Sequence, residues 1–173
     1  MIDTVPIVRE ATPADVEQLA PLFVHSVDTS IPGVIFSADP SYAPERVVPH
    51  LHVRLFPPKA IKTFVLELHT GELAGYASVK PGTDSEDEID MFFVRADLNG
   101  RGYGGQLMQA AQKESRSRGR GLHLLVFKKN TGAIRFYEKW GFRLVEGQER
   151  VMDLSLSEPA KETACLMRWA TIE

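Results

Sequence analysis

The sequence of 173 residues predicts an α/β fold: one mixed, twisted sheet of about seven strands flanked by about four helices. The periodicity of hydrophobic residues gives the order strand, helices, three strands, helix, strand, helix, two strands. No repeat, low-complexity tract or change of composition marks a linker. The length also fits one domain of roughly 100–200 residues. We therefore expect residues 1–173 to form a single domain.

The N-terminal part begins with a short strand and continues with helices. Residues 5–11, VPIVREA, are typical of a strand. Residues 12–27 predict a helix capped by Thr12, with proline at its first position. The stretch 28–59 is rich in proline and irregular, but apolar residues at four-residue spacing predict a helix over 43–56.

Three strands are expected in the middle of the chain. Residues 61–69 and 72–80 read as two strands joined by a Thr-Gly turn, which is a hairpin signal. The acidic stretch 81–88, PGTDSEDE, is expected to be a solvated loop. It leads into a strand over 89–95, IDMFFVR, that runs directly into a glycine-rich segment.

The remaining elements alternate between helix and strand. A helix is expected from residue 102 to about 118, with Gly119 ending it, and a buried strand over 122–128. Residues 130–142 predict a second helix, capped by Asn130 or Thr131 and ended by Gly141. Two last strands follow, over 142–156 and 163–170.

The composition excludes several classes of protein. With 43% hydrophobic and 25% charged residues, the chain is typical of a soluble globular protein. It has no apolar run long enough for a membrane span and no signal-peptide pattern, so we expect a cytoplasmic protein without a membrane partner. A net charge of −3 argues against general nucleic-acid binding, which needs a basic face.

Cysteine and histidine give no sign of a metal or redox site. The single cysteine, Cys165, lies in an apolar run and is expected to be a buried, inert thiol rather than a nucleophile. The five histidines do not form a ligand-spaced cluster with cysteines or carboxylates, so we expect no metal. These histidines are His25, His50, His52, His69 and His123.

The segment NGRGYGG, residues 99–105, contains the pattern GxGxxG between an expected strand and an expected helix. Such a turn suits a phosphate-bearing cofactor, because bare backbone N–H groups meet the ligand at a helix N-terminus. A dinucleotide-binding unit also needs an acidic residue about 20 residues further on, and none occurs between Glu114 and Glu138. A Walker-type loop fails as well, because no Lys-Ser or Lys-Thr follows the glycines.

The segments EIDMFFVRADLNGRGYGGQLM and NTGAIRFYEKWGF together resemble the acyl-CoA-binding core of the GNAT N-acetyltransferase superfamily. The resemblance is close over residues 88–142, and the order of elements extends it over nearly the whole chain. It implies the GNAT acyltransferase fold over residues 1–173 and acetyl-CoA as the co-substrate. Asn99 departs from the family pattern, which has Gln or Arg at this position.

The resemblance also implies where the cofactor binds. The amides of residues 101–105 would hold the pyrophosphate, helped by charge from Arg95, Arg101, Lys128 and Lys129. The strand ending at Val94 and the strand 122–128 would separate, so that the pantetheine arm lies between them. The residues implied in cofactor binding are Phe93, Val94, Asn99, Gly100, Arg101, Gly102, Tyr103, Gly104, Gly105, Asn130, Ala133 and Tyr137.

Acetylation of an amine needs a base, an oxyanion donor and an acid for the leaving thiolate. Glu88 is the first candidate for the base, and Asp90 is the second, since strand alternation places both on one face. Tyr137 stands at the family position whose phenol protonates the thiolate, and the amide near Val94 would be the oxyanion donor. The acids of the 81–88 stretch, Asp84, Glu86 and Asp87, are expected to be solvated and could attract a cationic amine.

Two functions are compatible with these residues. The first is an N-acetyltransferase that moves the acetyl group of acetyl-CoA to a primary amine of a small molecule or peptide, by direct attack in a ternary complex. The alternative is a non-catalytic acyl-CoA-binding sensor or interaction module. The acceptor stays open between a polyamine, an amino acid, an antibiotic and a protein N-terminus, and the oligomeric state between monomer and homodimer.

Overall fold

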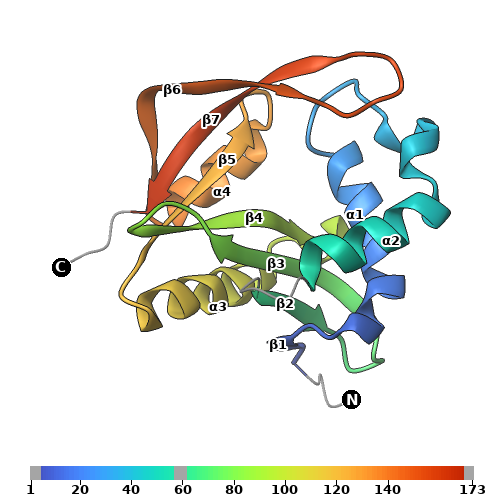
Figure 1. Ribbon diagram of the computed structural model, residues 1–173. Helices are drawn as coiled ribbons and strands as arrows, with labels where there is room; N and C mark the ends of the chain where they lie inside the picture. Colours follow the sequence, from blue (N-terminus) through green and yellow to red (C-terminus); the bar gives the residue numbers. More distant parts are fainter. Residues whose placement is uncertain (1–4, 57–61, 170–173) are drawn as a thin grey trace.

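A computed structural model describes residues 5–56 and 62–169 of the chain. Figure 1 shows one sheet with helices on both faces. The strands are β1 (Ile7–Glu10), β2 (Lys62–Glu67), β3 (Leu73–Pro81), β4 (Glu86–Val94), β5 (Gly121–Phe127), β6 (Phe142–Asp153) and β7 (Lys161–Trp169). The helices are α1 (Val16–Asp28), α2 (Pro44–Leu55), α3 (Tyr103–Ser117) and α4 (Thr131–Lys139), with short 3₁₀ turns before α1 and α2 and after β4.

The seven strands lie in the order β1-β2-β3-β4-β5-β7-β6. All neighbouring pairs are antiparallel except β4 and β5, which are parallel and are connected through α3. The expected fold class, with about seven strands and four helices, is confirmed. Residues 61 and 170, the outer ends of two expected strands, lie outside the described residues.

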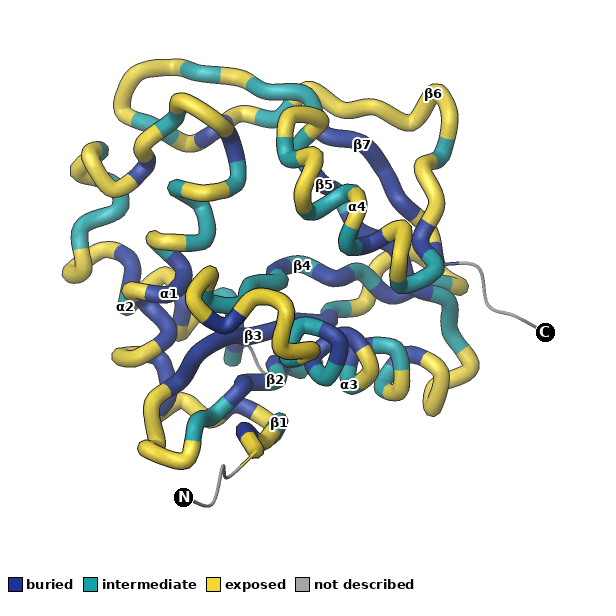
Figure 2. Tube along the Cα trace, turned by 180° about the vertical axis from the view of Figure 1, so that it is seen from behind, coloured by how far each residue is buried: buried dark blue, intermediate teal, exposed yellow. Residues whose placement is uncertain are grey.

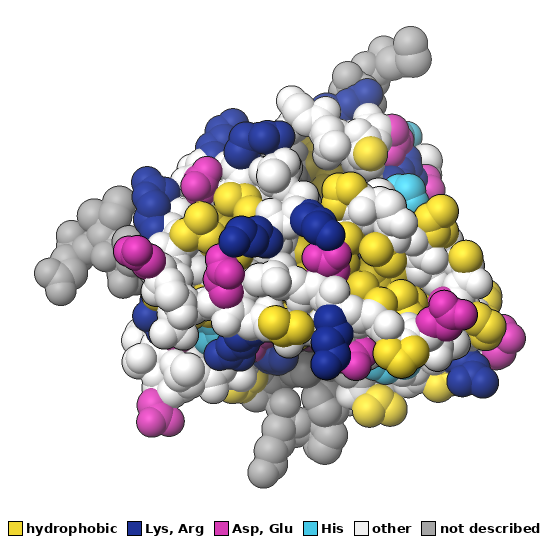
Figure 3. All heavy atoms as spheres, turned by 90° about the horizontal axis from the view of Figure 1, so that it is seen from above, with side chains coloured by type: hydrophobic (Ala, Val, Ile, Leu, Met, Phe, Trp, Pro, Cys, Tyr) yellow, Lys and Arg dark blue, Asp and Glu magenta, His cyan; other side chains and the backbone are white. Residues whose placement is uncertain are grey.

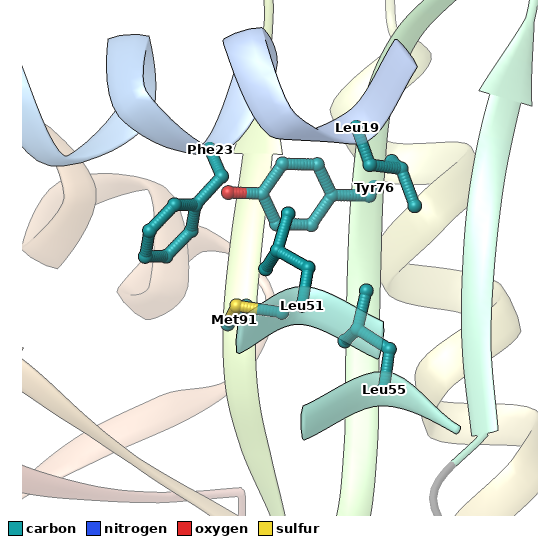
Figure 4. A pocket seen from close by; sticks show the side chains of 6 residues that line it. All are labelled: Leu19, Phe23, Leu51, Leu55, Tyr76 and Met91. Atoms are coloured by element: carbon teal, nitrogen blue, oxygen red, sulfur yellow. The ribbon is translucent and has the colours of Figure 1, made fainter. Parts of the chain in front are cut away.

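Helices α1 and α2 pack on one face of the sheet, and α3 and α4 pack on the other. The first core contains Leu19, Phe23, Leu51, Leu55, Tyr76 and Met91, which Figure 4 shows converging from α1, α2 and the strands. The second core lies under α3 and α4 and includes Met108, Leu124 and Met167. Figure 2 shows the burial concentrated along the central strands and the inner sides of the helices.

Local sequence signals explain where the helices begin and end. Pro13 opens the turn before α1, where its missing N–H costs nothing. Asn130 caps α4, its side chain accepting the Ala133 N–H at 3.2 Å. Gly119 and Gly141 follow α3 and α4 with φ of 64° and 89°, in the left-handed region that favours glycine. No helix among the described residues is long and apolar enough to cross a membrane.

The expectation of a solvated acidic loop over 81–88 is wrong in its last part. Strand β4 begins at Glu86, and Asp87 is fully buried. Its carboxylate pairs with Arg118 at 2.6 Å and Arg120 at 2.8 Å, on the chain that leaves α3. A buried carboxylate needs such partners, and the sequence alone does not show that two distant arginines meet it.

Candidate functional site

The parallel strands β4 and β5 separate halfway along their length. Their pairing runs from Glu86 and Gly121 to Ile89 and Leu124 and then stops, although both strands continue. Beyond this point β4 stays paired to β3, and β5 to β7, so the edges that face each other are not paired with one another. Figure 1 shows the two strands diverging. A strand edge of this kind can form main-chain hydrogen bonds with an extended ligand.

A cavity of about 1000 Å³ occupies this separation. Its wall includes the ends of β4 and β5, the glycine-rich segment, the start of α4 and parts of α1 and β6. Thirteen of the fourteen site residues expected from the sequence line it: Glu88, Asp90, Phe93, Val94, Asn99, Gly100, Gly102, Tyr103, Gly104, Gly105, Asn130, Ala133 and Tyr137. The exception is Arg101, which is exposed and does not line the cavity. The structure thus brings together residues that are far apart in the sequence.

The candidate base and acid lie on opposite faces of the sheet. The pairing of β3 with β4 is irregular around Asp90, which has no partner between Ile89 and Met91. This bulge puts Asp90 and Met91 on the α1 and α2 face, where Glu88 also lies. Tyr137, in contrast, packs in the core under α3 and α4. The cavity reaches both faces through the separation between the strands.

The N-terminus of α3 opens into the cavity. Gly102 precedes the helix with φ of 81°. The first backbone hydrogen bond of α3 is donated by the N–H of Gln106 to the carbonyl of Gly102. The N–H groups of residues 103–105 therefore have no acceptor within the helix, and the helix dipole adds partial positive charge at this point. This arrangement is suited to bind an anion such as a phosphate.

Gly104 and Gly105 have a second role, because Phe136 of α4 and Trp140, the residue that caps the C-terminus of α4, pack on them. A Cβ atom on Gly105 would lie 2.5 Å from Cζ2 of Trp140, and one on Gly104 would lie 3.1 Å from Cε2 of Phe136. Glycine at these positions therefore lets α4 approach the start of α3.

Glu88 projects from β4 into a half-buried setting beside the cavity. Its carboxylate lies 3.6 Å from Nζ of Lys80 and 3.7 Å from Nε2 of His123. The imidazole of His123 is the main cause that lowers the pKa of Glu88; burial opposes this shift and Lys80 supports it. Glu88 is thus ionised at neutral pH.

The carboxylate of Asp90 is closer to its partners than the carboxylate of Glu88 is. One oxygen accepts from Arg54 Nε of α2 at 2.8 Å, and the other accepts from Lys80 Nζ at 2.8 Å. Burial raises the pKa of Asp90, but the hydrogen bonds and charges of Arg54 and Lys80 outweigh it and lower the pKa below its usual value. Both carboxylate oxygens are therefore already engaged by cations.

Tyr137 lies among aromatic rings at the other side of the cavity. Its ring centroid is 6.0 Å from that of Phe92, 5.6 Å from that of Phe136 and 5.9 Å from that of Phe142. Burial raises the pKa of Tyr137 well above its usual range, so the phenol keeps its proton throughout the physiological range. It can donate that proton but is not a base.

The basic side chains expected to surround the cofactor are largely paired. Arg95 pairs with Asp97 and Glu72. Lys128 pairs with Glu149 and Lys129 with Glu162, both across the sheet on β6 and β7. These three side chains are therefore less available to a phosphate than the sequence suggested.

Several residues of the wall were missed by the sequence analysis. Arg54 of α2 reaches Asp90, and Tyr76 of β3 shares a 2.7 Å hydrogen bond with Ser26 of α1 beside the cavity. The helical spacing of α2 could have shown that Arg54 lies near the inner face, but nothing local shows that side chains of α2 reach β4.

Cys165 is buried, and burial raises the pKa of its thiol, in agreement with an inert residue. His50 and His52 lie two residues apart on a helix, α2, and so point in different directions. Within residues 5–56 and 62–169, no group of three or more His, Cys, Asp or Glu residues is placed to hold a metal ion.

A comparison with protein families matches residues 35–142 to the acetyltransferase (GNAT) family. This match spans more than half of the chain and contains the glycine-rich segment, both separated strands and Tyr137. The chain belongs to the GNAT acetyltransferase family. The resemblance inferred from the two sequence segments is confirmed, and the family is one of acetyl-transferring enzymes.

Solved structures of GNAT enzymes share the fold. An acetyltransferase of Streptococcus pneumoniae matches with a TM-score of 0.69 and 19% identity, covering 94% of this chain and 98% of that chain. The PaiA N-acetyltransferase of Thermoplasma acidophilum, solved in complex with coenzyme A, matches with a TM-score of 0.68 and 18% identity, covering 96% and 100%. A nourseothricin acetyltransferase is 28% identical over 66% of this chain and 68% of that chain, with a TM-score of 0.57. A search of curated proteins gave no match.

Proposed function

We propose that this GNAT protein is a single-domain enzyme that transfers the acetyl group of acetyl-CoA to a primary amine of a small molecule or peptide. The observation that carries the proposal is the cavity between β4 and β5, which joins Glu88 on one face of the sheet to Tyr137 on the other. A thioester between the strands would have an amine on one side and its leaving sulfur on the other. The complex of a related fold with coenzyme A supports acetyl-CoA as the donor.

The cofactor would bind through main-chain groups. The free amides of residues 103–105 would hold the pyrophosphate, and the unpaired edges of β4 and β5 would hydrogen-bond the pantetheine arm. Asn130 has an amide nitrogen to offer, since only its oxygen caps α4. With three of the neighbouring basic side chains in ion pairs, the main chain carries most of this binding.

The reaction would proceed by direct attack in a ternary complex. An alkylamine with a pKa of about 10.4 is protonated at neutral pH, so it must first lose a proton. Glu88 is the better base, because both oxygens of Asp90 are held by Arg54 and Lys80. The amine nitrogen then bonds to the carbonyl carbon, the amide near Val94 stabilises the oxyanion, and the carbon–sulfur bond breaks. Tyr137 donates its proton to the sulfur as negative charge develops there, and the second proton lost by the nitrogen restores the phenol.

The test is a measurement of free thiol release from acetyl-CoA with a panel of amines: a polyamine, several amino acids, an aminated antibiotic and a short peptide with a free N-terminus. We expect thiol release with at least one amine, together with an equal amount of acetylated product by mass spectrometry. Binding of acetyl-CoA without release with any amine would favour the non-catalytic binding module and would contradict the proposal.

A further inference from the structure

One face of the sheet carries a row of charged residues that crosses five strands. The register pairs Lys80 of β3 with Glu88 of β4, Glu88 with His123 of β5, His123 with Arg168 of β7, and Arg168 with Arg143 of β6. We call these five residues the charged row. Paired residues in neighbouring strands project on the same side, so the side chains of the first four residues are neighbours. The Arg143 guanidinium instead donates to the Glu138 and Phe142 carbonyls at 3.0 and 2.8 Å.

His123 is the titratable group in the middle of the charged row, and it is buried with 8% exposure. Its Nε2 lies 3.7 Å from Oε2 of Glu88, and its Nδ1 lies 3.4 Å from Oε2 of Glu86. Nδ1 is buried and makes no hydrogen bond with the described residues. The imidazole therefore lies between two carboxylates, with one ring nitrogen facing each.

The backbone leaves room for this imidazole. A Cβ atom on Gly82, in the turn before β4, would lie 2.6 Å from Cε1 of His123. The ring thus fills a space that is kept open by glycine, and this fixes its position between Glu86 and Glu88.

The three side chains connect the cavity with the protein surface. Glu88 lines the cavity, whereas Glu86 and His123 do not. At the far end Glu86 pairs with Nε of Arg168 at 2.9 Å, and the Arg168 side chain is 50% exposed. A path of titratable groups therefore runs from the cavity through Glu88, His123 and Glu86 to a solvated arginine.

The proposed reaction creates a need for such a path. An ammonium substrate and acetyl-CoA give an amide, the free thiol of CoA and one proton: the nitrogen loses two protons, and the thiolate takes up one. The other proton must leave the cavity in each turnover. Asp90 is a poor carrier, because Arg54 and Lys80 occupy both of its oxygens.

We propose that His123 carries the amine's proton from Glu88 to Glu86 and so to solvent. An imidazole suits this role because it can take a proton at Nε2 and release the other from Nδ1. The inference rests on the proposed amine acetylation.

Other charged groups lie around the imidazole and affect the proton transfer from Glu88 to Glu86. Lys80 of β3 faces Glu88, Arg168 of β7 faces Glu86, and Arg143 of β6 follows Arg168 in the register. Arg54 of α2 is held by Asp90. The lowered pKa of Glu88, caused first by His123, agrees with close coupling of the two groups. The cations at both ends of the path favour return of the carboxylates to their ionised form after each transfer.

The experiment compares His123→Gln and Glu86→Gln with a matched control, His52→Gln, on the exposed side of α2. Glutamine can hydrogen-bond but cannot carry a proton. We expect kcat to fall about tenfold in both path variants, with the rise of kcat with pH moved toward alkaline pH. Imidazole in the buffer should restore part of the rate of His123→Ala. The dissociation constant of acetyl-CoA should stay unchanged in all variants, and His52→Gln should behave as the unaltered protein.

A second measurement is independent of turnover. The ¹⁵N spectrum of the imidazole should change at one ring nitrogen in Glu88→Gln and at the other in Glu86→Gln. If the unaltered enzyme acetylates amines but His123→Gln keeps its rate and pH profile, the relay is wrong and the proposed function stands. If no amine is acetylated, the proposed function fails. If neither Glu88→Gln nor Glu86→Gln changes the ¹⁵N spectrum, the coupling of His123 to the two carboxylates is wrong as well.

Discussion

At the scale of single residues, the site depends on how each titratable group is partnered. Glu88 has the Lys80 ammonium at 3.6 Å and the His123 imidazole at 3.7 Å, whereas Asp90 has two cations at 2.8 Å. Tyr137 has aromatic neighbours and a raised pKa. The sequence and the family resemblance name these three residues, with Glu88 as the first candidate base and Asp90 as the second. The distances to Lys80 and Arg54 favour the same order.

Glu88→Gln should lower kcat by about 10²-fold or more, because a positioned base contributes on that order. Asp90→Asn should act differently: it leaves Arg54 and Lys80 without their shared carboxylate, so the stability should fall as well as the activity. Steady-state kinetics and thermal unfolding of both variants separate the two effects. A larger loss of kcat in a fully stable Asp90→Asn would reverse the assignment.

Tyr137→Phe removes the proton donor and keeps the ring that packs against Phe92 and Phe142. We expect kcat to fall about 10- to 100-fold with an unchanged dissociation constant for acetyl-CoA. Since the folded-state pKa of Tyr137 is raised, its phenol stays protonated above its usual value near 10. We therefore expect that Tyr137 causes no decline of kcat in the unaltered enzyme up to about pH 9.5. A decline of kcat near pH 8 that disappears in Tyr137→Phe would contradict this assignment.

At the scale of elements, the sequence predicted most of the fold because its signals are local. The glycines after residue 98 mark the start of α3, and the Asn130 cap and Gly141 mark the limits of α4. The start of β4 at Glu86 was missed, because Asp87 looks like a solvated acid until Arg118 and Arg120 meet it. Such a contact arises from the tertiary fold and leaves no periodic pattern.

The separation of β4 from β5 could not be derived from periodicity. The halves that separate, after Ile89 in β4 and after Leu124 in β5, are mostly apolar and look suited to pair. Only the family resemblance implied that they separate, and the register shows that pairing ends at Ile89 and Leu124. The bulge at Asp90 is equally invisible in the sequence, although it decides which β4 side chains face α2.

The contact between α3 and α4 gives a prediction for stability. Gly105→Ala places a Cβ atom against Trp140 and should destabilise the fold by about 1–3 kcal/mol, the usual cost of overpacking. Gly132→Ala in α4 is the matched control, because nothing lies within 4 Å of its Cβ position. It should be neutral or stabilising by about 0.5–1 kcal/mol. Chemical denaturation measures the free energy of unfolding of both variants. Equal changes would contradict the prediction, because they would show that the packing of Trp140 does not require glycine at position 105.

At the scale of the whole molecule, two distant segments meet over the α1 and α2 side of the cavity. The Asp39 carboxylate accepts from the Ser157 N–H at 2.8 Å and from its hydroxyl at 2.9 Å. Ile31, Phe36 and Leu154 are buried together beneath this contact. In Figures 1 and 2 the connection of β6 with β7 lies beside the segment between α1 and α2. Figure 3, seen from above, shows hydrophobic side chains exposed among charged ones on this face.

Asp39→Ala should loosen this contact and raise the KM for the amine several-fold, while the dissociation constant of acetyl-CoA stays the same. The reason is that Phe36, Tyr42 and Leu154 line the cavity beside these two segments. Glu158→Ala, an exposed change next to Ser157, is the control. If Asp39→Ala raises only the KM for acetyl-CoA, the prediction is wrong, and acetyl-CoA rather than the amine binds beside Asp39 and Ser157.

Hydrogen exchange with and without acetyl-CoA tests the central claim most directly. If the donor lies between the separated strands, the amides of residues 90–94, 103–105 and 125–127 should be protected when acetyl-CoA is added, and NAD should have no such effect. Protection confined to other parts of the chain, or protection by NAD alone, would contradict the account of donor binding and of the chemistry built on it.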